Sequence, residues 1–242
     1  MVAARAPACK RRGMPIDPPA THVIYDMDGL LLDTERFYTE VTQRIVGRYG
    51  KVFDWSVKSN MVGRPAIESA RYLVATLELP ITAEDYLRER EGMLEELMPT
   101  AEPMPGAVEL TRALAARGVP QAVATSTGRR LFDLKTQRHR DWFALFAAVV
   151  LGDDPRIAHG KPAPDIFLLA ARELGAEPAS CVVLEDAPSG VAAARAAGMR
   201  VVAVPYPGMD AAKLADADVV VASLEELDPD HLVARRGRPA TP

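Results

Sequence analysis

The sequence predicts an α/β fold, in which a parallel sheet is built through helical crossovers and one helical segment interrupts the alternation. Three observations lead to this prediction. Short Val-rich runs recur along the chain without polar–apolar alternation, as expected of strands buried on both faces. Helical segments separate most of these runs, which is typical of a parallel sheet. The segment from about residue 36 to residue 98 contains no comparable run.

The individual elements follow from these patterns. We expect strands at residues 21–25, 121–124, 147–151, 180–184, 200–204 and 217–221. Helices are expected between them at residues 107–117, 164–174 and 188–197, and in the interrupting segment at residues 34–49, 65–77 and 83–98. Pro164 and Pro188 stand at helix starts, and Gly118, Gly175 and Gly198 follow helix ends, in keeping with the positional preferences of these residues.

This pattern divides the chain into a core, residues 21–35 and 100–233, and a helical insertion, residues 36–99. Residues 1–20 place four basic residues among Ala and Pro, with no acid before Asp17. We expect a disordered tail there, with an organelle-targeting segment as the alternative. Residues 234–242 are rich in Arg, Pro and Gly and are also expected to be disordered.

The composition excludes several functional classes. A formal charge of −4 and the absence of a basic stripe with interleaved aromatics give no indication of a nucleic-acid partner. No apolar run approaches the roughly 20 residues that a membrane helix needs. The two cysteines, Cys9 and Cys181, favour a reducing compartment. We therefore expect a cytoplasmic monomer, with plastid or mitochondrion as the alternative through the basic N-terminal segment.

Two pairs of acidic residues follow predicted strands. Asp26 and Asp28 come directly after the first strand, at the sheet edge where α/β proteins bind ligands. Such closely spaced carboxylates repel each other and need a cation or a shared proton, and Mg²⁺ prefers oxygen ligands. Taken alone, this pair also fits an exposed loop. Glu185 and Asp186 follow another strand; capping of the next helix would explain one acid there, but not two.

Two further segments carry candidate phosphate ligands. Lys161 lies between Gly160 and two prolines, which restrict the backbone. This rigid turn favours a functional role over that of an ordinary surface lysine. The run Thr125-Ser126-Thr127-Gly128 follows a strand and precedes a helix, where hydroxyls and N–H groups can hold a phosphate, although such residues are also common helix caps. The acidic pair Asp153 and Asp154 fits a supporting or a structural role equally well.

In order and spacing, Asp26-Met-Asp28-Gly, Thr125, Lys161-Pro and Glu185-Asp186 resemble the four motifs of the haloacid dehalogenase superfamily. The resemblance covers residues 21–232. It implies a Rossmann-like parallel sheet core with an inserted α-helical cap domain, and a phosphatase that uses Mg²⁺.

The resemblance also assigns roles to matching positions. Asp26 corresponds to the nucleophile that forms an aspartyl phosphate, and Asp28 to the general acid and base. The Asp26 carboxylate, the Asp28 carbonyl and Asp186 correspond to magnesium ligands, with Glu185 beside them. Thr125, with Ser126 beside it, and Lys161 correspond to phosphate-binding groups. In the cap, Gly63 and Arg64 are candidates for substrate contact, and an exposed Arg64 at a helix start is the alternative.

Departures from the motifs narrow the expected activity. Dehalogenases and ion-pumping ATPases lack the second acid, so Asp28 argues against both. A phosphosugar mutase of the β-phosphoglucomutase type carries His where this chain has Tyr38, and Arg where it has Ala66. A non-catalytic protein that binds phosphorylated ligands is less expected still, because the motif residues are intact.

The substrate prediction depends on longer stretches, including residues 21–35 and 132–139. These stretches resemble plant-type glycerol-3-phosphate phosphatases and pseudouridine-5′-phosphate phosphatases. Residues 37–40, 54–56 and 135–139 favour the first group. The predicted reaction is hydrolysis of glycerol 3-phosphate to glycerol and phosphate, and pseudouridine 5′-phosphate is the alternative substrate.

Overall fold

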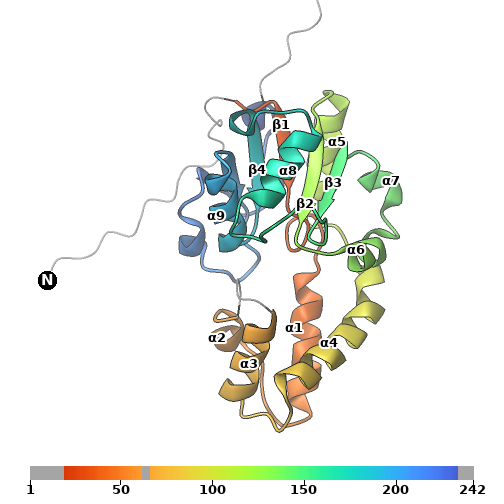
Figure 1. The fold of residues 1–242 in the computed structure, drawn as a ribbon, viewed down its shortest axis with the longest axis vertical. Helices are drawn as coiled ribbons and strands as arrows, with labels where there is room; N and C mark the ends of the chain where they lie inside the picture. The colour runs from red at the N-terminus through yellow and green to blue at the C-terminus, as the bar shows by residue number, and fades with distance from the viewer. Residues whose placement is uncertain (1–18, 62–65, 234–242) are drawn as a thin grey trace, which may run out of the picture.

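A computed structural model describes residues 19–61 and 66–233. Most of the predicted N-terminal tail, the whole C-terminal tail and the cap positions Gly63 and Arg64 lie outside the described residues. Within them, the chain forms a sheet-based core and a group of helices below it (Figure 1). No described helix is both long enough and apolar enough to cross a membrane.

The core is a six-stranded parallel sheet with the order β3-β2-β1-β4-β5-β6. The strands are β1 (His22–Tyr25), β2 (Gln121–Thr125), β3 (Ala148–Leu151), β4 (Cys181–Glu185), β5 (Arg200–Ala203) and β6 (Val219–Val220). The predicted α/β class with a parallel sheet is therefore confirmed. The last strand is shorter than the five residues expected, because the Asp218 carboxylate, not a backbone carbonyl, accepts the hydrogen bond of Val201 N at 2.8 Å.

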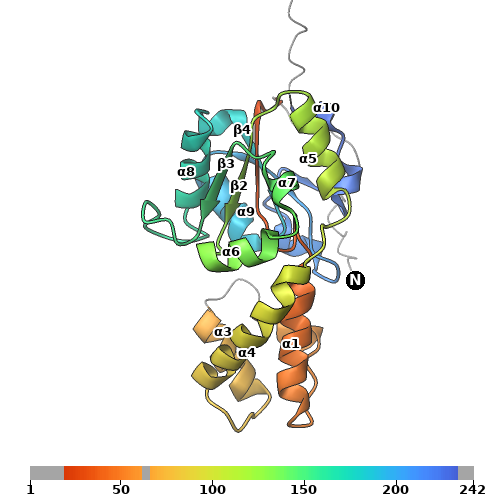
Figure 2. The same cartoon turned by 90° about the vertical axis from the view of Figure 1, so that its right-hand side faces the viewer.

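Helices cover both faces of the sheet (Figure 2). α8 (Asp165–Glu173) and α9 (Pro188–Ala196) pack on one face, over strand residues such as Ile24 and Val183. α5 (Ala107–Ala116) and α10 (Pro229–Leu232) cover the other face. Two further helices, α6 (Arg129–Thr136) and α7 (Arg140–Phe143), follow β2 along the chain. Strands covered on both faces need continuous apolar runs, and this explains why the Val-rich runs do not alternate.

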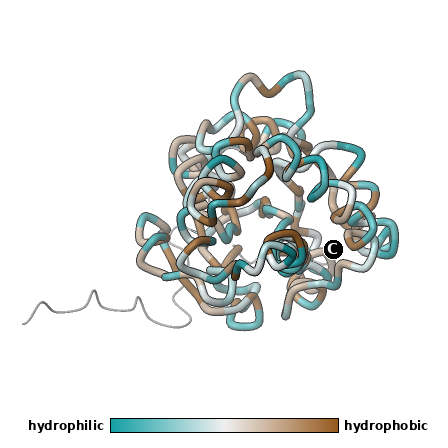
Figure 3. The backbone as a smooth tube through the Cα atoms, turned by 90° about the horizontal axis from the view of Figure 1, so that it is seen from below, coloured by the Kyte–Doolittle hydropathy of each residue, from teal (hydrophilic) through white to brown (hydrophobic). Residues whose placement is uncertain are grey.

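The helical insertion between β1 and β2 forms the lower body in Figure 1. It contains α1 (Glu35–Gly47), α2 (Trp55–Lys58), α3 (Ala66–Thr76) and α4 (Ala83–Leu97). The sequence predicted all of these except the short α2, which the Asp54 side chain caps. Seen from below, hydrophilic segments lie mostly at the periphery and hydrophobic ones further inside (Figure 3).

The two chain segments that enter and leave the insertion lie side by side. Leu32 and Pro103 form an isolated antiparallel bridge. Asp33 N donates to Glu102 O, and Met104 N donates to Leu31 O, both at 2.9 Å. The insertion is thus attached to the core through two adjoining strand-like connectors.

Polar contacts also connect the cap with the core away from these connectors. Arg130 on α6 donates to Glu95 on α4, with Nη2 at 2.6 Å from Oε2. Lys213, which lies beyond β5, donates to Ser59 O of the cap, with Nζ at 3.4 Å. These contacts hold the cap against the carboxyl ends of the strands. The strand order reverses between β1 and β4, and in open α/β sheets ligands bind at such a point.

Candidate active site

A cavity of about 540 Å³ lies between the carboxyl ends of the strands and the cap. Its sheet-edge wall consists of residues at or just beyond the carboxyl ends of β1, β2 and β4, among them Asp26, Asp28, Thr125 and Asp186. Its cap wall includes Tyr38 and Arg90. The sequence-predicted residues of four separate segments therefore meet in one pocket.

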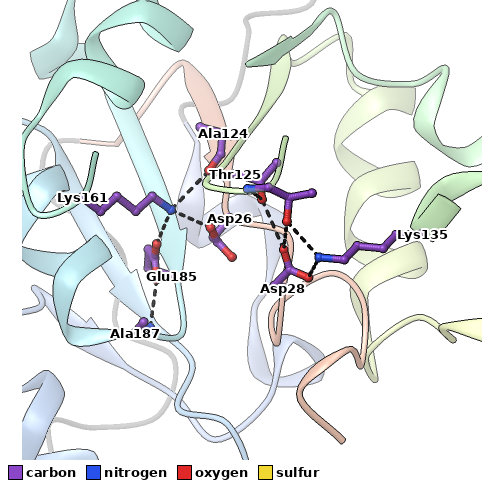
Figure 4. Close-up of polar contacts among 9 residues, drawn as sticks. Asp26, Asp28, Ala124, Thr125, Lys135, Lys161, Glu185 and Ala187 are labelled. Carbon is purple, nitrogen blue, oxygen red and sulfur yellow. Dashed lines mark hydrogen bonds and ion pairs between the residues drawn. The ribbon is translucent and has the colours of Figure 1, made fainter. Parts of the chain in front are cut away.

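Lys161 binds two acids of the sheet edge, Asp26 and Glu185 (Figure 4). Its Nζ lies 2.5 Å from Asp26 Oδ1, 2.7 Å from Glu185 Oε1 and 3.3 Å from Ala124 O. All three charged side chains are buried. Burial lowers the pKa of Lys161, but the two carboxylates outweigh it, so the pKa lies above its ordinary value. The ammonium group therefore stays charged and fixes the orientation of Asp26.

Glu185 is held in place by the start of the next helix. Its Oε2 accepts a hydrogen bond from Ala187 N at 2.9 Å. A Cβ atom at Gly190 would lie 1.7 Å from Glu185 Oε1, so only glycine leaves room for this carboxylate. Asp186 does not cap α9, which has Ala187 at its N-cap position and no side-chain cap. The capping alternative for Asp186 is therefore wrong.

Asp28 belongs to a second cluster of polar contacts (Figure 4). Its Oδ1 accepts hydrogen bonds from Thr34 Oγ1 and Lys135 Nζ, both at 2.6 Å. Its Oδ2 accepts from Thr127 Oγ1 at 2.7 Å and from Thr125 Oγ1 at 3.3 Å. Burial raises the pKa of Asp28, but Lys135 and these hydrogen bonds outweigh it, and the pKa lies below its ordinary value.

The pKa values of Asp26 and Asp186 shift in the opposite direction to that of Asp28. Burial, with the neighbouring Glu185 and Asp28, raises the pKa of Asp26 to about 7 despite the opposing effect of Lys161. Burial and the charges of Glu185 and Asp26 also raise the pKa of Asp186 well above its ordinary value. Both shifts indicate a site where negative charge is incompletely compensated.

The donor set at this point fits a divalent cation. Asp26, Glu185 and Asp186 share a single ammonium group, that of Lys161, so ionisation of all three leaves two negative charges uncompensated. Among the described residues, the buried Asp186 carboxylate has neither a hydrogen bond nor an ion pair. A Cβ atom at Gly29, whose φ is +82°, would lie 2.3 Å from Asp186 Oδ2.

The number of acidic ligands limits the kind of metal. Among the described residues, no three His, Cys, Asp or Glu side chains are arranged as a metal-binding group. The Asp28 carboxylate is occupied by its four donors, which leaves its backbone carbonyl as a possible ligand. Two carboxylates, a carbonyl and several waters suit Mg²⁺, which usually keeps part of its hydration shell and binds substrate phosphate.

The loop after β2 offers hydroxyl groups to the same pocket. Thr125 is buried, and its Oγ1 accepts a hydrogen bond from Thr127 N at 3.0 Å. Ser126 is exposed and lines the pocket. Thr127, which belongs to the same predicted segment, also lines the pocket and contacts Asp28.

The structure gives Asp153 and Asp154 local contacts outside the pocket lining. Asp153 Oδ2 accepts a hydrogen bond from Arg129 N at 2.7 Å, the first residue of α6. It thus satisfies a free N–H group at a helix N-terminus, where negative charge is favourable. Asp154 binds Arg156, with Oδ2 at 2.7 Å from Nη2.

The cap wall combines aromatic rings with two cations. Lys58 is buried, and its Nζ lies 2.8 Å from Thr39 Oγ1 and 3.1 Å from Glu35 Oε2. Arg90 differs, because it forms no ion pair with any described acid. Its guanidinium carbon lies 5.7 Å from the ring centres of both Tyr38 and Tyr86. Its Nε is buried and has no hydrogen-bond partner among the described residues.

Sequence reasoning missed the roles of Lys135 and Lys58. Lys135 lies within residues 132–139, which were noted for their resemblance to known phosphatases. A signal was present, because Phe132, Lys135 and Thr136 share the buried face of α6. A lysine on the same helix face as an apolar residue indicates that the lysine is buried and paired with an acid. Lys58 lies in the unpredicted α2, where four residues give no periodicity to read.

Comparison with known proteins decides the family. The sequence model described as "haloacid dehalogenase-like hydrolase" matches residues 20–198. The chain belongs to the haloacid dehalogenase-like hydrolase family. It is 53% identical over 215 residues to "(DL)-glycerol-3-phosphatase 1, mitochondrial" of Arabidopsis thaliana, covering 87% of this chain and 72% of the relative. It is 46% identical over 213 residues to "Probable pseudouridine-5′-phosphatase" of Drosophila melanogaster, covering 87% and 92%. The predicted superfamily and hydrolase class are confirmed.

Solved structures of haloacid dehalogenase-like proteins share the fold. A putative β-phosphoglucomutase from Thermotoga maritima matches with a TM-score of 0.70 and 31% identity, covering 87% of this chain and 96% of that one. A family hydrolase from Deinococcus radiodurans, determined with bound phosphate and sodium, matches with a TM-score of 0.73 and 29% identity, covering 86% and 93%. The predicted Rossmann-like core with its helical cap is confirmed by these matches.

Proposed function

We propose that this protein is a magnesium-dependent phosphatase that hydrolyses glycerol 3-phosphate to glycerol and phosphate through an aspartyl phosphate on Asp26. One observation carries the proposal. Asp26 is a buried carboxylate whose orientation is fixed by the Lys161 ammonium at 2.5 Å, and it lines a cavity shared with Asp28. Phosphoryl transfer depends mainly on such positioning and on charge stabilisation.

The first half-reaction transfers the phosphoryl group to the protein. An Asp26 oxygen attacks phosphorus, and the bond between phosphorus and the glycerol oxygen breaks. Asp28 is ionised in the free protein, so it takes up a proton from solvent as the ester binds and gives it to that oxygen. The negative charge of an incoming phosphate ester favours this role, because a nearby anion raises the pKa of Asp28. Lys161, Thr125 and Ser126 bind the phosphoryl oxygens.

The second half-reaction regenerates Asp26. Asp28 takes a proton from a water molecule, whose oxygen attacks phosphorus. The bond between phosphorus and the Asp26 oxygen breaks, and inorganic phosphate leaves. Asp28 is thus protonated again, and it keeps this proton for the next ester or returns it to solvent, so the protein regains its initial state.

The Asp26 carboxylate, the Asp28 carbonyl and Asp186 would hold Mg²⁺, with Glu185 beside them. When bound, the cation neutralises charge on the phosphoryl oxygens and lessens repulsion between the ester and the acidic cluster. The unpartnered Asp186 carboxylate is the observation that supports this ligand set.

The choice of glycerol 3-phosphate follows the relatives named glycerol-3-phosphatases, which reach 53% identity. Pseudouridine 5′-phosphate stays the alternative, because a probable pseudouridine-5′-phosphatase reaches 46%. A phosphosugar mutase is less favoured despite the Thermotoga match, because Tyr38 and Ala66 stand on the cap wall at the positions where such mutases carry His and Arg. We further propose a cytoplasmic monomer, with plastid or mitochondrion as the alternative compartment.

A phosphate-release screen tests the substrate. Purified protein with Mg²⁺ is assayed against glycerol 3-phosphate, glycerol 2-phosphate, pseudouridine 5′-phosphate, 2-phosphoglycolate and hexose phosphates. We expect the highest kcat/KM for glycerol 3-phosphate. A tenfold preference, about 1.4 kcal/mol, for pseudouridine 5′-phosphate would replace the substrate and leave the mechanism intact. Isomerised hexose phosphate with little free phosphate would instead establish a mutase.

A further inference from the structure

Lys135 is a buried cation beside Asp28 that the motifs do not include. Its side chain is 0% exposed, although it belongs to the last turn of α6. Its Nζ lies 2.6 Å from Asp28 Oδ1 and 2.8 Å from Thr127 Oγ1. A fully buried lysine is costly unless it is paired, so the fold gives up stability to keep this ammonium group at Asp28.

Each oxygen of Asp28 receives two donors, but the donors differ in strength. Three of them are neutral hydroxyls of Thr34, Thr125 and Thr127. Lys135 forms the one ion pair of Asp28 within the part of the chain that the structure describes. All four donors bind an ionised carboxylate, but only Lys135 adds a full positive charge, so its attraction to the carboxylate is the strongest of the four and sets the orientation of Asp28. Lys135 also contacts Thr127 and so joins both oxygens of Asp28 into one network.

The fold places Lys135 through contacts at both ends of α6. Asp153 accepts from the first N–H of the helix, at Arg129. Phe132 and Thr136 bury the same helix face as Lys135. On the outer side, Arg130 binds Glu95 of the cap. The position of the ammonium group is therefore set by the core and by the cap together.

We propose that Lys135 is a positioning residue that holds the Asp28 carboxylate in the orientation from which it exchanges protons with the leaving oxygen and with the attacking water. This inference rests on the proposed phosphatase function. Lys135 itself contacts neither Asp26 nor the residues assigned to the phosphoryl oxygens through any hydrogen bond among the described residues. A misplacement of about 1 Å at a reacting group can cost about 10²-fold in rate, which makes such a fixed orientation worth its cost.

Substrates with different leaving groups distinguish a positioning role of Lys135 from a general structural role. When the phosphorus–oxygen bond of an alkyl ester breaks, its electron pair goes to an alkoxide oxygen that needs the proton of Asp28. A nitrophenolate takes the same electron pair without that proton. Loss of the Asp28 orientation should therefore slow phosphoryl transfer from alkyl phosphates and spare transfer from p-nitrophenyl phosphate. It should slow the later attack of water with either substrate.

The experiment compares Lys135→Met with the parent protein in single-turnover and burst measurements. We expect glycerol formation from glycerol 3-phosphate to fall about 10²-fold, the lower end of a general acid's contribution. The nitrophenolate burst should keep the parent rate, while the steady-state rate after the burst falls. The matched control is Arg129→Met, which removes an exposed cation from the same helix and should change none of these rates. An equally slowed burst would overturn the proposal.

A double variant covers the case in which Lys135→Met is too unstable to assay. Lys135→Met combined with Asp28→Asn removes both charges of the buried pair, and each variant's folding is checked by thermal unfolding. Because Lys135 acts only through Asp28, the double variant should match Asp28→Asn alone in both assays. A further loss in the double variant would show that Lys135 acts on the phosphoryl group or on the fold.

These outcomes separate the Lys135 role from the substrate proposal. If the parent releases nitrophenolate but no glycerol, the proposed substrate fails and the Lys135 role is still decided by the burst and steady-state rates with p-nitrophenyl phosphate. If the parent forms glycerol and Lys135→Met forms it at the same rate, the Lys135 role fails and the substrate stands.

Discussion

The two walls of the pocket satisfy their charges in different ways. On the sheet-edge wall, each acid is hydrogen-bonded to a buried lysine: Asp26 binds Lys161, and Asp28 binds Lys135. On the cap wall, Arg90 lies between two tyrosine rings and has a buried Nε without a partner among the described residues. The first wall is organised before substrate arrives, whereas the second keeps an unused donor. We infer that the sheet edge serves the reaction and the cap serves recognition.

The largest expected effect breaks the sheet-edge wall. Asp26→Asn removes the nucleophile and should lower kcat by about 10⁶-fold, comparable to nucleophile removal in other enzymes that form covalent intermediates. Phosphate release from glycerol 3-phosphate measures it. Asp133→Asn, at an exposed position on α6, is the control and should keep its activity. Residual activity of Asp26→Asn within tenfold of the parent would disprove the covalent route.

The metal gives a smaller effect with a defined pH dependence. Asp26 has a folded-state pKa of about 7 against 3.8 for a free side chain, so between these values the folded protein holds more protons than the unfolded one. Without metal, this group therefore lowers stability as pH rises through that window, and Asp186 acts in the same direction. Mg²⁺ binds the ionised acids and should stabilise the protein more at about pH 8 than at about pH 5.

Thermal unfolding with Mg²⁺ and with EDTA at the two pH values measures this difference. At a concentration of about 100 Kd, the stabilisation at the higher pH should be about 2.7 kcal/mol. Asp186→Asn is the control and should lose most of it. Equal shifts in Tm at both pH values would show that Mg²⁺ does not bind at these acids.

The smallest expected effect tests whether the cap wall contributes to substrate recognition. Arg90→Met removes the donor that the substrate would engage, and a hydrogen bond to a charged group contributes about 1.5 kcal/mol or more, or about tenfold in KM. We expect KM for glycerol 3-phosphate to rise by that factor with little change in kcat. Arg88→Met, an exposed position on the same helix, should leave both constants unchanged. A fall in kcat alone would place Arg90 in the chemistry rather than in recognition.

The sheet-edge wall was largely predictable from the sequence, whereas the cap wall was not. Asp26, Glu185 and Asp186 directly follow or end apolar runs, and parallel strands bring their carboxyl ends to one edge. The contact between Lys135 and Asp28 was not predicted, because the two residues lie 107 positions apart in the sequence. Their contact depends on how α6 packs against the core. Arg90 looked like any exposed helical arginine, since nothing local marks a side chain that stacks between Tyr38 and Tyr86. Strand ends are a local property, whereas helix packing against a pocket is not.

The adjoining connectors of the cap have a consequence for protein engineering. Leu32 and Pro103 pair directly, so the ends of the intervening segment lie next to each other. A segment whose ends adjoin can be replaced by another of different length without separating the strands that it joins. We therefore expect that the helical insertion can be exchanged as a cassette between relatives while the acids and lysines of the sheet edge stay unchanged.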